Sequence, residues 1–414
     1  MQEKKYEVGG KSARILLIAL SLLTLVDFAD RSVLTISLQA IKQAFDLTDA
    51  QAGMLPSLLQ LGIALLILPV SIFGDRWARR KAVMIMTTIW SIFTVVTGLA
   101  TQFWHMVVAR FMVGAGEAGY MPIGQTWMSV SFRKDVRSLM FSIFYMFMPI
   151  GTAIGTILGG IILTATGNWR IAFFVFGLPG LLVAIWILFM RDYTVVKSGE
   201  GVLTKEYFKS WSKILRIKSW WLVTLTWLFI FFYNFAILAW IPTLAIRAYN
   251  LTAAAAGTGL GLVALVYVLG PIGGWLADRW QRKSTNGRPY LSTIFVFLSV
   301  VTQTIAVLNV SLPFNTWIII YAISQIFFGL AAPVYMALPQ DITPPELRST
   351  ALGMSNFIAQ IGGGMWGSVA VGVVSDTLGG GVHGVQMGLL LATAFALVGV
   401  VLLMAMFKYY PRME

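Results

Sequence analysis

The sequence predicts an all-α integral membrane protein with twelve transmembrane helices, arranged in two six-helix halves related by a pseudo-two-fold axis. Three observations lead to this prediction. Of the 414 residues, 58% are hydrophobic and only 11% are charged, about half the charged share of an ordinary soluble chain. Apolar runs long enough to cross a bilayer recur along the whole chain. A charged motif that begins at Asp75 is repeated 203 residues later.

Charged segments and breaks rich in glycine or proline separate the apolar runs into twelve candidate spans. The first run follows Lys11 and Arg14 and is too long for the hydrophobic part of a cleaved signal peptide, so we expect a retained helix. The spans run approximately over residues 15–40, 51–73, 82–101, 104–129, 137–165, 169–190, 219–248, 253–277, 289–309, 314–337, 349–376 and 386–408.

Lysine and arginine are strongly biased to one side of these spans. If the amino terminus is cytoplasmic, the cytoplasmic segments hold 25 of the 30 residues of these types, and the opposite side holds only Lys42, Arg170 and Arg247. By the positive-inside rule, both termini are then in the cytoplasm of a multi-pass plasma-membrane protein, which in a bacterium means the inner membrane. The net charge of +13 is therefore a signal of topology, and we expect no nucleic acid partner.

The longest polar connection, residues 192–218, divides the spans into six and six. We expect residues 1–191 to form the first half and residues 219–414 to form the second. The connection includes the aromatic and basic run YFKSWSKILRIKSWW. Such a run is typical of an amphipathic helix lying on the cytoplasmic leaflet, and a plain tether is the alternative.

An internal repeat supports this division. The run DRWARR that begins at Asp75 returns as DRWQRK at Asp278, and each copy lies between the second and third spans of its half. A weaker echo relates Gly151 to Gly362, 211 residues later. Two parallel halves with binding sites between them, near the middle of the membrane, are a known arrangement of secondary transporters.

The composition argues against an enzyme. The chain has no cysteine, and its two histidines, His105 and His383, lie beside predicted loops. It contains neither an HExxH motif nor a Walker loop, which also argues against an ATP-driven pump. We therefore expect no enzymatic activity, no metal and no cofactor. A receptor or channel is the alternative from another class, and conductance without saturation would indicate a channel.

The first span carries three ionisable residues, Asp27, Asp30 and Arg31. A charge at the bilayer centre costs at least roughly 2.5–3.5 kcal/mol, so such side chains should face protein or water and serve a function there. Asp27 and Arg31 are four residues apart on one helix face, and we expect them to pair. Asp30 points about 100° away from Arg31 and is free for another partner.

The fourth span carries Arg110 and Glu117 within the run RFMVGAGEAGY. Their spacing of seven residues corresponds to about two helical turns, so the two side chains lie on one face roughly 10 Å apart. Gly114, Gly116 and Gly119 allow this helix to pack closely against its neighbours, as small residues do in membranes.

The chain resembles the major facilitator superfamily. The loop after the second span is similar to the superfamily's G-x-x-x-D-R-x-G-R-R/K signature, although Ser71 and Ala78 replace its two glycines. The resemblance implies a major facilitator fold and a cytoplasmic gate that holds the halves together when the transporter faces outward. A simpler explanation is that these charges only satisfy the positive-inside rule. The gate residues would be Asp75, Arg76, Arg79, Asp278, Arg279 and Arg282.

Within the superfamily, the Asp30-Arg31 pair and the spacing of Arg110 and Glu117 are similar to the anion:cation symporters, which include sugar-acid carriers, and equally to the spinster lysolipid transporters. The run SIFYMFMPIGTAIG resembles the spinster group more, and ELRSTALGMSNFIAQIGG resembles the organic-anion group more. The resemblance implies a proton-coupled symporter of a small organic anion, a carboxylate, that works by alternating access. The alternative is a proton-dependent transporter of lysophospholipids or other lysolipids.

The same resemblance implies a role for each charge. Asp30 and Glu117 carry protons, and Arg31 and Arg110 hold the substrate anion or release the carboxylates. Asp27 positions Arg31 or serves as a third proton carrier. Burial raises the pKa of a carboxyl group and a nearby guanidinium lowers it, so movement of an arginine can couple proton binding to substrate binding. The alternative is a permanent ion-pair network that joins the first and fourth spans.

The second half has no ionisable residue deep in a span. From this half we expect neutral hydrogen bonds and aromatic contacts to the substrate, with proton coupling confined to the first half. The candidates are Tyr233, Asn234, Tyr321, Asn356 and Gln360, with Asn356 first because an amide can reach a carboxylate or a hydroxyl group. Each could instead join helices. We expect a monomer whose partners are the bilayer, the anionic substrate and protons.

Overall fold

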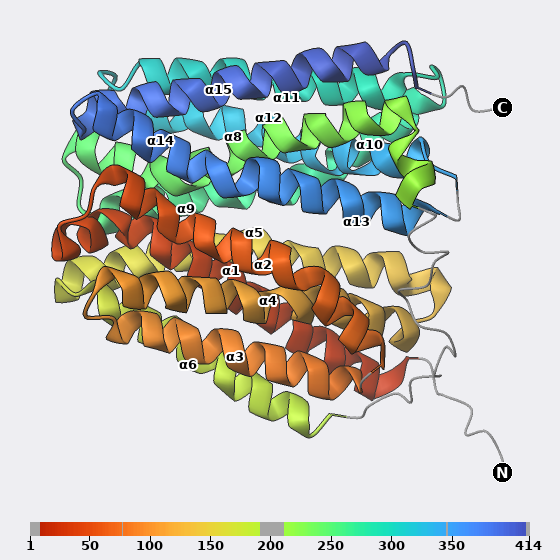
Figure 1. Cartoon of the computed structure of the whole chain (residues 1–414), viewed down its shortest axis with the longest axis horizontal. Coiled ribbons are helices and arrows are strands. Elements are labelled where there is room, and N and C mark those ends of the chain that lie inside the picture. The colour runs from red at the N-terminus through yellow and green to blue at the C-terminus, as the bar shows by residue number, and fades with distance from the viewer. Residues whose placement is uncertain (1–8, 77, 191–210, 345–346, 411–414) are drawn as a thin grey trace.

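The computed structural model describes residues 9–76, 78–190, 211–344 and 347–410. Within these ranges the chain is almost entirely helical and contains no strand. Two helix bundles lie side by side, with the first and last helices meeting the same end of the molecule (Figure 1). We call the end where α1 begins and α15 ends the terminal side, and the opposite end the far side.

The first bundle consists of six helices that alternate in direction between the two sides. The turns that join them are short, so neighbours in sequence run antiparallel. The helices are α1 (Gly10–Phe45), α2 (Asp49–Arg76), α3 (Arg79–Leu99), α4 (Phe103–Ser131), α5 (Lys134–Thr166) and α6 (Trp169–Leu188).

The second bundle crosses between the sides six more times. Two of its crossings are interrupted, one by the 3₁₀ turn η1 and one by the π turn η3. The elements are α8 (Lys218–Tyr249), α9 (Ala253–Ala264), η1 (Leu265–Leu269), α10 (Gly270–Gln281), α11 (Gly287–Leu308), α12 (Phe314–Asp341), α13 (Arg348–Ala359), η3 (Gln360–Gly364), α14 (Met365–Thr377) and α15 (Gly381–Met406).

These twelve crossings confirm the predicted fold class. The largest errors in the predicted ends are five residues, for example at the start of the first span, where 15 was expected and α1 begins at Gly10. Among the described residues, eleven helical segments are long and apolar enough to span a membrane, and α4, with its two charges, completes the twelve. Most of the predicted linker, residues 192–218, lies outside the described residues, so the boundaries of the halves stay a prediction.

The first helix of each bundle ends in the same way on the far side. Asp46 follows α1 and Asn250 follows α8, 204 residues later, and each has the left-handed φ of 50°. The backbone N–H of each residue donates to a carbonyl of the last turn, from Lys42 and Ile246 respectively. Aspartate and asparagine tolerate this conformation better than most residues. The shared ending supports the repeat that the sequence predicts.

Glycine contacts join the two bundles near the far side. A Cβ added to Gly53 of α2 would lie 2.4 Å from the carbonyl oxygen of Ser368 on α14. A Cβ added to Gly257 of α9 would lie 2.4 Å from the carbonyl oxygen of Thr156 on α5. Because such contacts exclude any side chain, they bring the helix backbones close together. Two crossings, α2 with α14 and α5 with α9, therefore close this half of the seam between the bundles.

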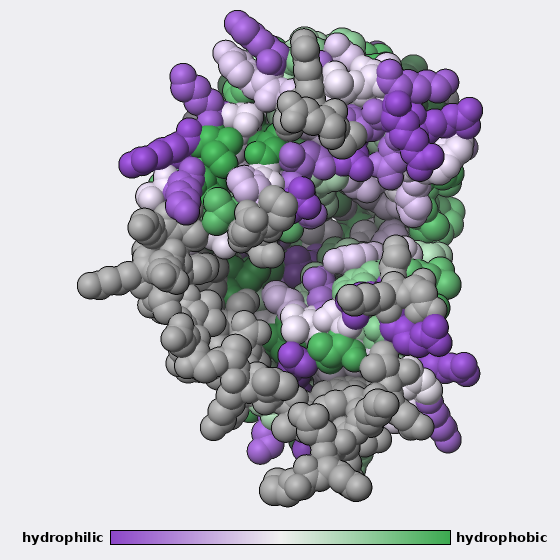
Figure 2. All heavy atoms as spheres, turned by 90° about the vertical axis from the view of Figure 1, so that its right-hand side faces the viewer, coloured by the Kyte–Doolittle hydropathy of each residue, from purple (hydrophilic) through white to green (hydrophobic). Residues whose placement is uncertain are grey.

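The seam is open toward the terminal side. Figure 2 shows that side of the molecule, whose surface is hollowed between the two bundles. The glycine contacts described above lie in the far half of their helices. The bundles therefore meet at the far side and diverge toward the terminal side.

The outer surface is apolar, as a bilayer requires. On α6 the side chains of Leu178, Leu182 and Ile185 are 52%, 67% and 53% exposed. A soluble protein rarely leaves such a row of large aliphatic residues in water. The row indicates a helix face that lies against lipid.

Candidate functional site

The five ionisable residues predicted inside the first and fourth spans form two adjoining groups between α1 and α4. Four of them are buried, and only Arg31 has substantial exposed surface, with 25% of its side chain accessible. All lie in the middle part of their helices, well away from both ends. The residues are Asp27, Asp30 and Arg31 on α1, and Arg110 and Glu117 on α4.

Asp30 and Arg110 form an inner pair. Nη1 of Arg110 lies 3.1 Å from Oδ2 of Asp30, and Nη2 lies 3.3 Å from Oδ1, so the guanidinium donates two parallel hydrogen bonds. It also donates to the hydroxyl of Thr97 on α3 and lies over the ring of Phe173 on α6. Arg110 was predicted to hold the substrate. The structure places its guanidinium inside the first bundle, where it is fully buried in this state.

Arg31 forms an outer group with Asp27 and Glu117. Its Nε lies 2.9 Å from Oδ1 of Asp27, as the four-residue spacing predicts. Its Nη2 lies 2.6 Å from Oε2 of Glu117, although the angle is poor for a hydrogen bond and neither oxygen of Glu117 has a well-aligned donor. The hydroxyl of Tyr120 donates to Oδ2 of Asp27 at 2.6 Å. One guanidinium therefore holds two carboxylates.

α1 occupies the seam because α5 packs directly on its backbone. A Cβ added to Gly151 or Gly155 of α5 would lie 2.3 Å from the carbonyl oxygen of Leu25 or 2.2 Å from that of Ala29. Small residues allow such close approach of helix backbones in membranes. α1 also contacts α8 of the second bundle. The exposed part of Arg31 therefore belongs to a helix that borders both bundles.

The glycines of α4 determine how closely Glu117 approaches the other helices. A Cβ added to Gly114 would lie 2.0 Å from the carbonyl oxygen of Leu59 on α2, and one added to Gly116 would lie 2.5 Å from the backbone nitrogen of Trp90 on α3. α4 is thus held between α2 and α3 by close glycine contacts, the kind of packing that its glycines predict. This packing leaves the face that carries Glu117 directed at α1.

The charges of the two groups do not balance. Three carboxyl groups, from Asp27, Asp30 and Glu117, face two guanidinium groups. An uncompensated charge is costly in a buried site, and one proton on a carboxyl group removes it. The poorly aligned carboxyl of Glu117, which contacts the exposed arginine, is chemically suited to take that proton.

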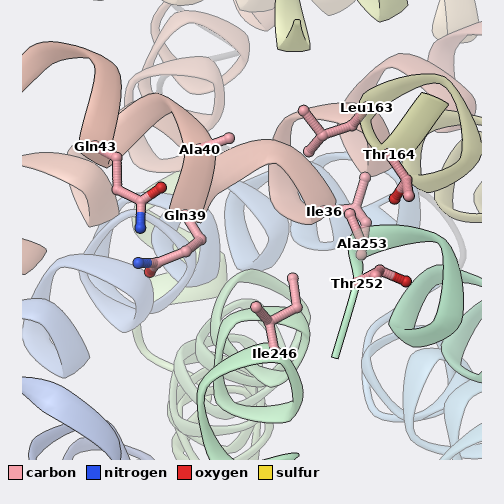
Figure 3. Close-up of a pocket in the computed structure, with 9 residues that line it drawn as sticks. All are labelled: Ile36, Gln39, Ala40, Gln43, Leu163, Thr164, Ile246, Thr252 and Ala253. Atoms are coloured by element: carbon pink, nitrogen blue, oxygen red, sulfur yellow. The ribbon is translucent and has the colours of Figure 1, made fainter. Parts of the chain in front are cut away.

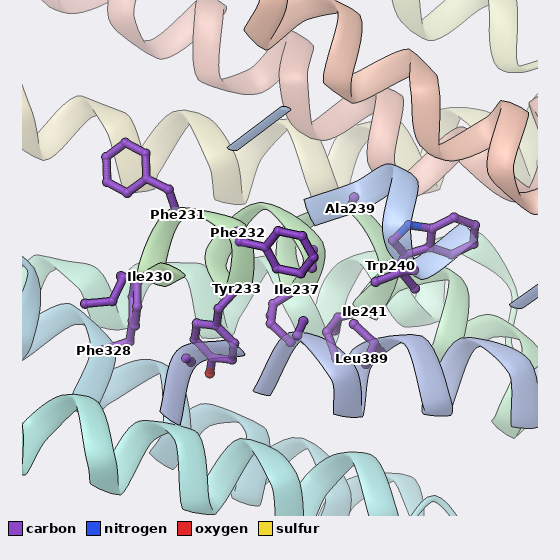
Figure 4. Close-up of a cluster of buried hydrophobic side chains, with 14 of the residues drawn as sticks. Ile230, Phe231, Phe232, Tyr233, Ile237, Ala239, Trp240, Ile241, Phe328 and Leu389 are labelled. Atoms are coloured by element: carbon purple, nitrogen blue, oxygen red, sulfur yellow. The ribbon is translucent and has the colours of Figure 1, made fainter. Parts of the chain in front are cut away.

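Two of the polar residues predicted in the second half lie inside the second bundle. Tyr233 points away from the first bundle in Figure 4, and its hydroxyl lies 3.4 Å from that of Ser299 on α11. Tyr321 is 6% exposed and stacks on Trp317. A hydrogen bond from Ser324 to Gln303 extends this neutral network. Tyr233 therefore joins α8 to α11 in this state, while Tyr321 stacks within α12.

The other three predicted residues of the second half are partly exposed. Asn234 follows Tyr233 directly, so it points about 100° away from that buried side chain. Asn356 lies on α13, and Gln360 opens the π turn η3. The Oε1 atom of Gln360 is buried and has no hydrogen-bond donor. Their partial exposure leaves these three available to a ligand.

A group of charges on the far side was missed by the sequence analysis. Nη2 and Nη1 of Arg247, at the end of α8, lie 2.7 Å and 3.0 Å from the two carboxylate oxygens of Asp49, at the start of α2. Lys42 also pairs with Asp49, whose side chain is fully buried. The Nε of Arg247 donates to Gln39. We call the pair of Asp49 and Arg247 the far-side latch, because it joins the two bundles.

The latch is reinforced by the end of α14. The carboxylate of Asp376 accepts hydrogen bonds from the backbone N–H groups of Asp49 and Ala50, both at 2.8 Å, and so caps α2 from the opposite bundle. The hydroxyl of Ser375 donates to Asp49 at 2.6 Å. The sequence held one signal: Lys42 and Arg247 are two of only three basic residues on a side that is otherwise poor in them.

A cavity of about 310 Å³ lies beside the latch on the far side. Residues from α1 and the end of α5 face residues from α8 and α9 across it (Figure 3). It lies near the far ends of these helices and is separate from the charges around Arg31. Its lining residues are Ile36, Gln39, Ala40, Gln43, Leu163, Thr164, Ile246, Thr252 and Ala253.

The predicted gate on the terminal side has partners within its own bundle, as far as its side chains are described. Nη2 of Arg288 lies 2.7 Å from Oδ1 of Asp278, and Nη1 lies 2.6 Å from Oδ1 of Asp341. Tyr410 donates to Asp341. Burial, and then this carboxylate, raise the pKa of the Tyr410 hydroxyl, which therefore remains a donor. The guanidinium of Arg279 lies over the ring of Trp275.

The remaining gate residues lie at helix ends on the terminal side. Arg79 begins α3 and Arg282 follows α10. The backbone of Asp75 and Arg76 ends α2, but their side chains lie outside the described part of the chain. The role of these residues as a gate stays a prediction.

The comparisons with known proteins agree on one family. The family model for the Major Facilitator Superfamily matches residues 20–367. The chain is 25% identical to the Sphingosine-1-phosphate transporter SPNS2 of Mus musculus over 87% of this chain and 69% of that protein. It is 27% identical to the "Probable sulfoacetate transporter SauU" of Cupriavidus necator over 84% of each chain.

A solved structure has a similar fold. It is the crystal structure of a bacterial homolog of the human lysosomal transporter Spinster, in an inward-facing and unoccupied conformation. The match has a TM-score of 0.84 and covers 97% of this chain and 98% of that one, at 20% sequence identity. The predicted resemblances to the superfamily, to spinster proteins and to organic-anion carriers are thereby confirmed.

Proposed function

The chain belongs to the Major Facilitator Superfamily and is a membrane transporter related to spinster proteins and to a sulfoacetate carrier, and from this premise we propose that it is a proton-coupled symporter of a small organic anion. The anion is a carboxylate, and transport follows alternating access in the plasma membrane. The protein acts as a monomer with both termini in the cytoplasm. The relatives and solved neighbours compared above are transporters, which fits a chain without enzymatic activity.

One observation carries the proposal: the partly exposed guanidinium of Arg31 holds two carboxylates at once. A guanidinium binds carboxylates well, so a substrate anion can replace either side chain as its partner. The replacement is favourable when one carboxyl group is protonated, because the local charge is then balanced. Proton binding and anion binding at Arg31 therefore support each other.

The proposed cycle follows from this exchange. A proton on Glu117 releases that carboxyl group from Arg31, and the substrate anion takes its place. When the proton leaves, Glu117 returns to Arg31 and displaces the anion. Asp27 keeps Arg31 oriented through their hydrogen bond of 2.9 Å. Asp30, which Arg110 pairs fully in this state, is the second proton carrier once that pair opens.

The direction of the open seam follows from the charge distribution. If the terminal side is cytoplasmic, as the excess of basic residues favours, this structure is an inward-facing state with the far-side latch closed. The gate residues Asp75, Arg76 and Arg79 and their counterparts in the second half would then engage only after the seam closes on the cytoplasmic side. In this state Asp278 pairs with Arg288 of its own bundle, and closure of the seam would let it exchange that partner for one in the first bundle.

A lysolipid is the second candidate for the substrate, in a proton-dependent spinster-like transporter. The similarity to a sphingosine 1-phosphate transporter and to a bacterial Spinster homolog favours it. Both candidates share an anionic group for Arg31, and the lysolipid adds a long acyl chain. Counterflow with labelled sugar acids, compared with labelled lysophospholipid in the same proteoliposomes, separates them. If only the labelled lysophospholipid is exchanged, the proposed substrate is a lysolipid and not a carboxylate.

The test of proton coupling is Glu117→Gln in proteoliposomes. The amide cannot exchange a proton, so we expect loss of uphill accumulation driven by a pH gradient, while counterflow exchange of the anion continues. Asp46→Asn is the matched control, because it removes a carboxylate from an exposed turn and asparagine tolerates the same left-handed backbone. Loss of both activities in a folded Glu117→Gln protein, or retention of both, contradicts the proposed role.

A further inference from the structure

Two amide side chains from opposite bundles carry buried oxygens without donors. Gln60 of α2 is 4% exposed, and Gln360 is the first residue of η3. The Oε1 atoms of both lack a hydrogen-bond partner. A buried polar atom without a partner costs roughly 1–3 kcal/mol, so two such atoms in one region need an explanation.

The helical register places Gln60 opposite η3. Gly53 and Ser57 of α2 both meet Ser368 of α14, and the hydroxyl oxygens of Ser57 and Ser368 are 2.6 Å apart. Gln60 lies three residues after Ser57 on the same face, one turn closer to the terminal side. α14 runs in the opposite direction, so the turn that precedes Ser368 is η3. α2 contacts η3 directly, which agrees with this register.

The π turn directs Gln360 along its own helix. A Cβ added to Gly364 would lie 2.8 Å from Oε1 of Gln360 and 2.9 Å from the ring of Phe235 on α8. Glycine at this position therefore makes the room that the amide occupies. π turns inside α-helices occur frequently at functional sites. Gln360 is thus held beside its own helix and α8 with an oxygen that has no donor.

Both amides lie close to the level of the charges around Arg31. Leu59, the neighbour of Gln60, meets Gly114 of α4. Glu117 lies three residues further along α4, which at ~1.5 Å per residue is about 5 Å toward the terminal side. The register therefore places both amides within about two helical turns of the level of Glu117.

We propose that Gln60 and Gln360 accept hydrogen bonds from hydroxyl or N–H groups of the substrate whose anionic group binds Arg31. The inference rests on the proposed function and narrows it to anions that carry such donors beside the charged group. A site built to pair with a donor discriminates against an analogue that lacks it, because the site's own polar atoms then stay unpaired. Because Gln60 and Gln360 belong to different bundles, both can contact one substrate only while the bundles lie close together at this level.

The test compares ligands of equal length with and without donors. Binding to the purified protein is measured by thermal stabilisation, because a ligand that binds the folded state raises its apparent stability. Gluconate and hexanoate are six-carbon carboxylates with and without hydroxyl groups. Sphingosine 1-phosphate and octadecyl phosphate, which both have 18-carbon chains, form the equivalent lipid pair. The variants are Gln60→Leu and Gln360→Leu, and Gln43→Leu, at an exposed amide of α1, is the control.

We expect each variant to weaken binding of the donor-bearing member of a pair by about 2- to 10-fold, the effect of one lost hydrogen bond, with the other member and the control unchanged. Equal affinities for the two members in the unsubstituted protein, or a preference for the donor that survives both substitutions, overturn this inference alone. If none of the four anions binds the unsubstituted protein, the proposed function fails and this inference fails with it.

Discussion

Each half buries polar side chains inside its bundle, but the first half uses charged groups and the second half uses neutral ones. Asp30 and Tyr233 are 203 residues apart, the same offset as the repeated motif that begins at Asp75, and both point into the interior of their bundle. In the first half the interior partners are a carboxylate and a guanidinium. In the second they are hydroxyl and amide groups, because Tyr233 meets Ser299 and this network continues to Gln303 on α11.

The residues that follow them differ in the same way. Arg31 corresponds to Asn234 at the same offset, and each is partly exposed. A neutral network is easier to bury than a charged one, since it carries no desolvated ion. The difference teaches that charge in the first half is retained despite its cost, which is expected of a functional site in a membrane protein. The predictions below test this asymmetry, beginning with the largest effect.

Removing one partner of the inner pair should have the largest effect on stability. Arg110→Met leaves the carboxylate of Asp30 buried without a counter-charge, and we expect a loss of about 3–5 kcal/mol in the free energy of unfolding. The double variant Asp30→Asn with Arg110→Gln imitates the neutral chemistry of the second half and should recover most of that loss. Thermal unfolding in detergent measures both. A single variant as stable as the double one would show that the pair carries no buried charge.

Opening the far-side latch should have an intermediate effect. Asp49→Asn removes the charge that Arg247 and Lys42 share, so the bundles should separate more often on that side. Because the chain has no cysteine, Ser368→Cys supplies a unique buried thiol at the α2–α14 contact. We expect a charged maleimide added from the far side to label it about 10-fold faster with Asp49→Asn, equivalent to about 1.4 kcal/mol.

Asp278→Asn provides the control for the latch. It also removes a carboxylate from an arginine, but on the terminal side and within one bundle. Labelling of the introduced cysteine at position 368 should not become faster in this variant. Equal acceleration by both substitutions would mean that the latch has no specific hold on the far side.

The smallest effect is expected in the second half. Tyr233→Phe removes one neutral hydrogen bond, whose oxygens are 3.4 Å apart, so we expect a loss of about 1 kcal/mol or less and unchanged proton coupling. Thermal unfolding and accumulation driven by a pH gradient are the two measurements. A Tyr233→Phe protein that exchanges the anion but no longer accumulates it would show that the second half takes part in proton coupling. The contrast between the two halves would then be wrong.

The sequence was sufficient for features that depend on local spacing. The twelve spans follow from hydrophobic length, and the pair of Asp27 and Arg31 follows from the helical period. The need of Asp30 for a separate partner also follows from that period. The identity of that partner, Arg110, depends on how α1 and α4 pack, which the spacing within either helix does not determine.

Features that depend on contacts between distant segments were missed. The latch joins Asp49 to Arg247 across 198 residues, and neither residue lies in a motif. The orientation of Tyr233 toward Ser299 depends on how the helices of the second bundle are arranged, so a polar residue in a span gave no indication of which way it points. Gln60 was not singled out because its surroundings become unusual only where α2 meets the π turn.

The glycine contacts between the bundles have a consequence for how easily the molecule changes shape. At Gly53 and Gly257 the nearest opposing group is a peptide carbonyl. Because backbone meets backbone at these two points, the helices can separate and return to the same register without repacking a side chain between them. The polar contacts of Asp49 with Arg247, Ser375 and Asp376 are then discrete bonds whose strength can be tuned one residue at a time without rebuilding the helices.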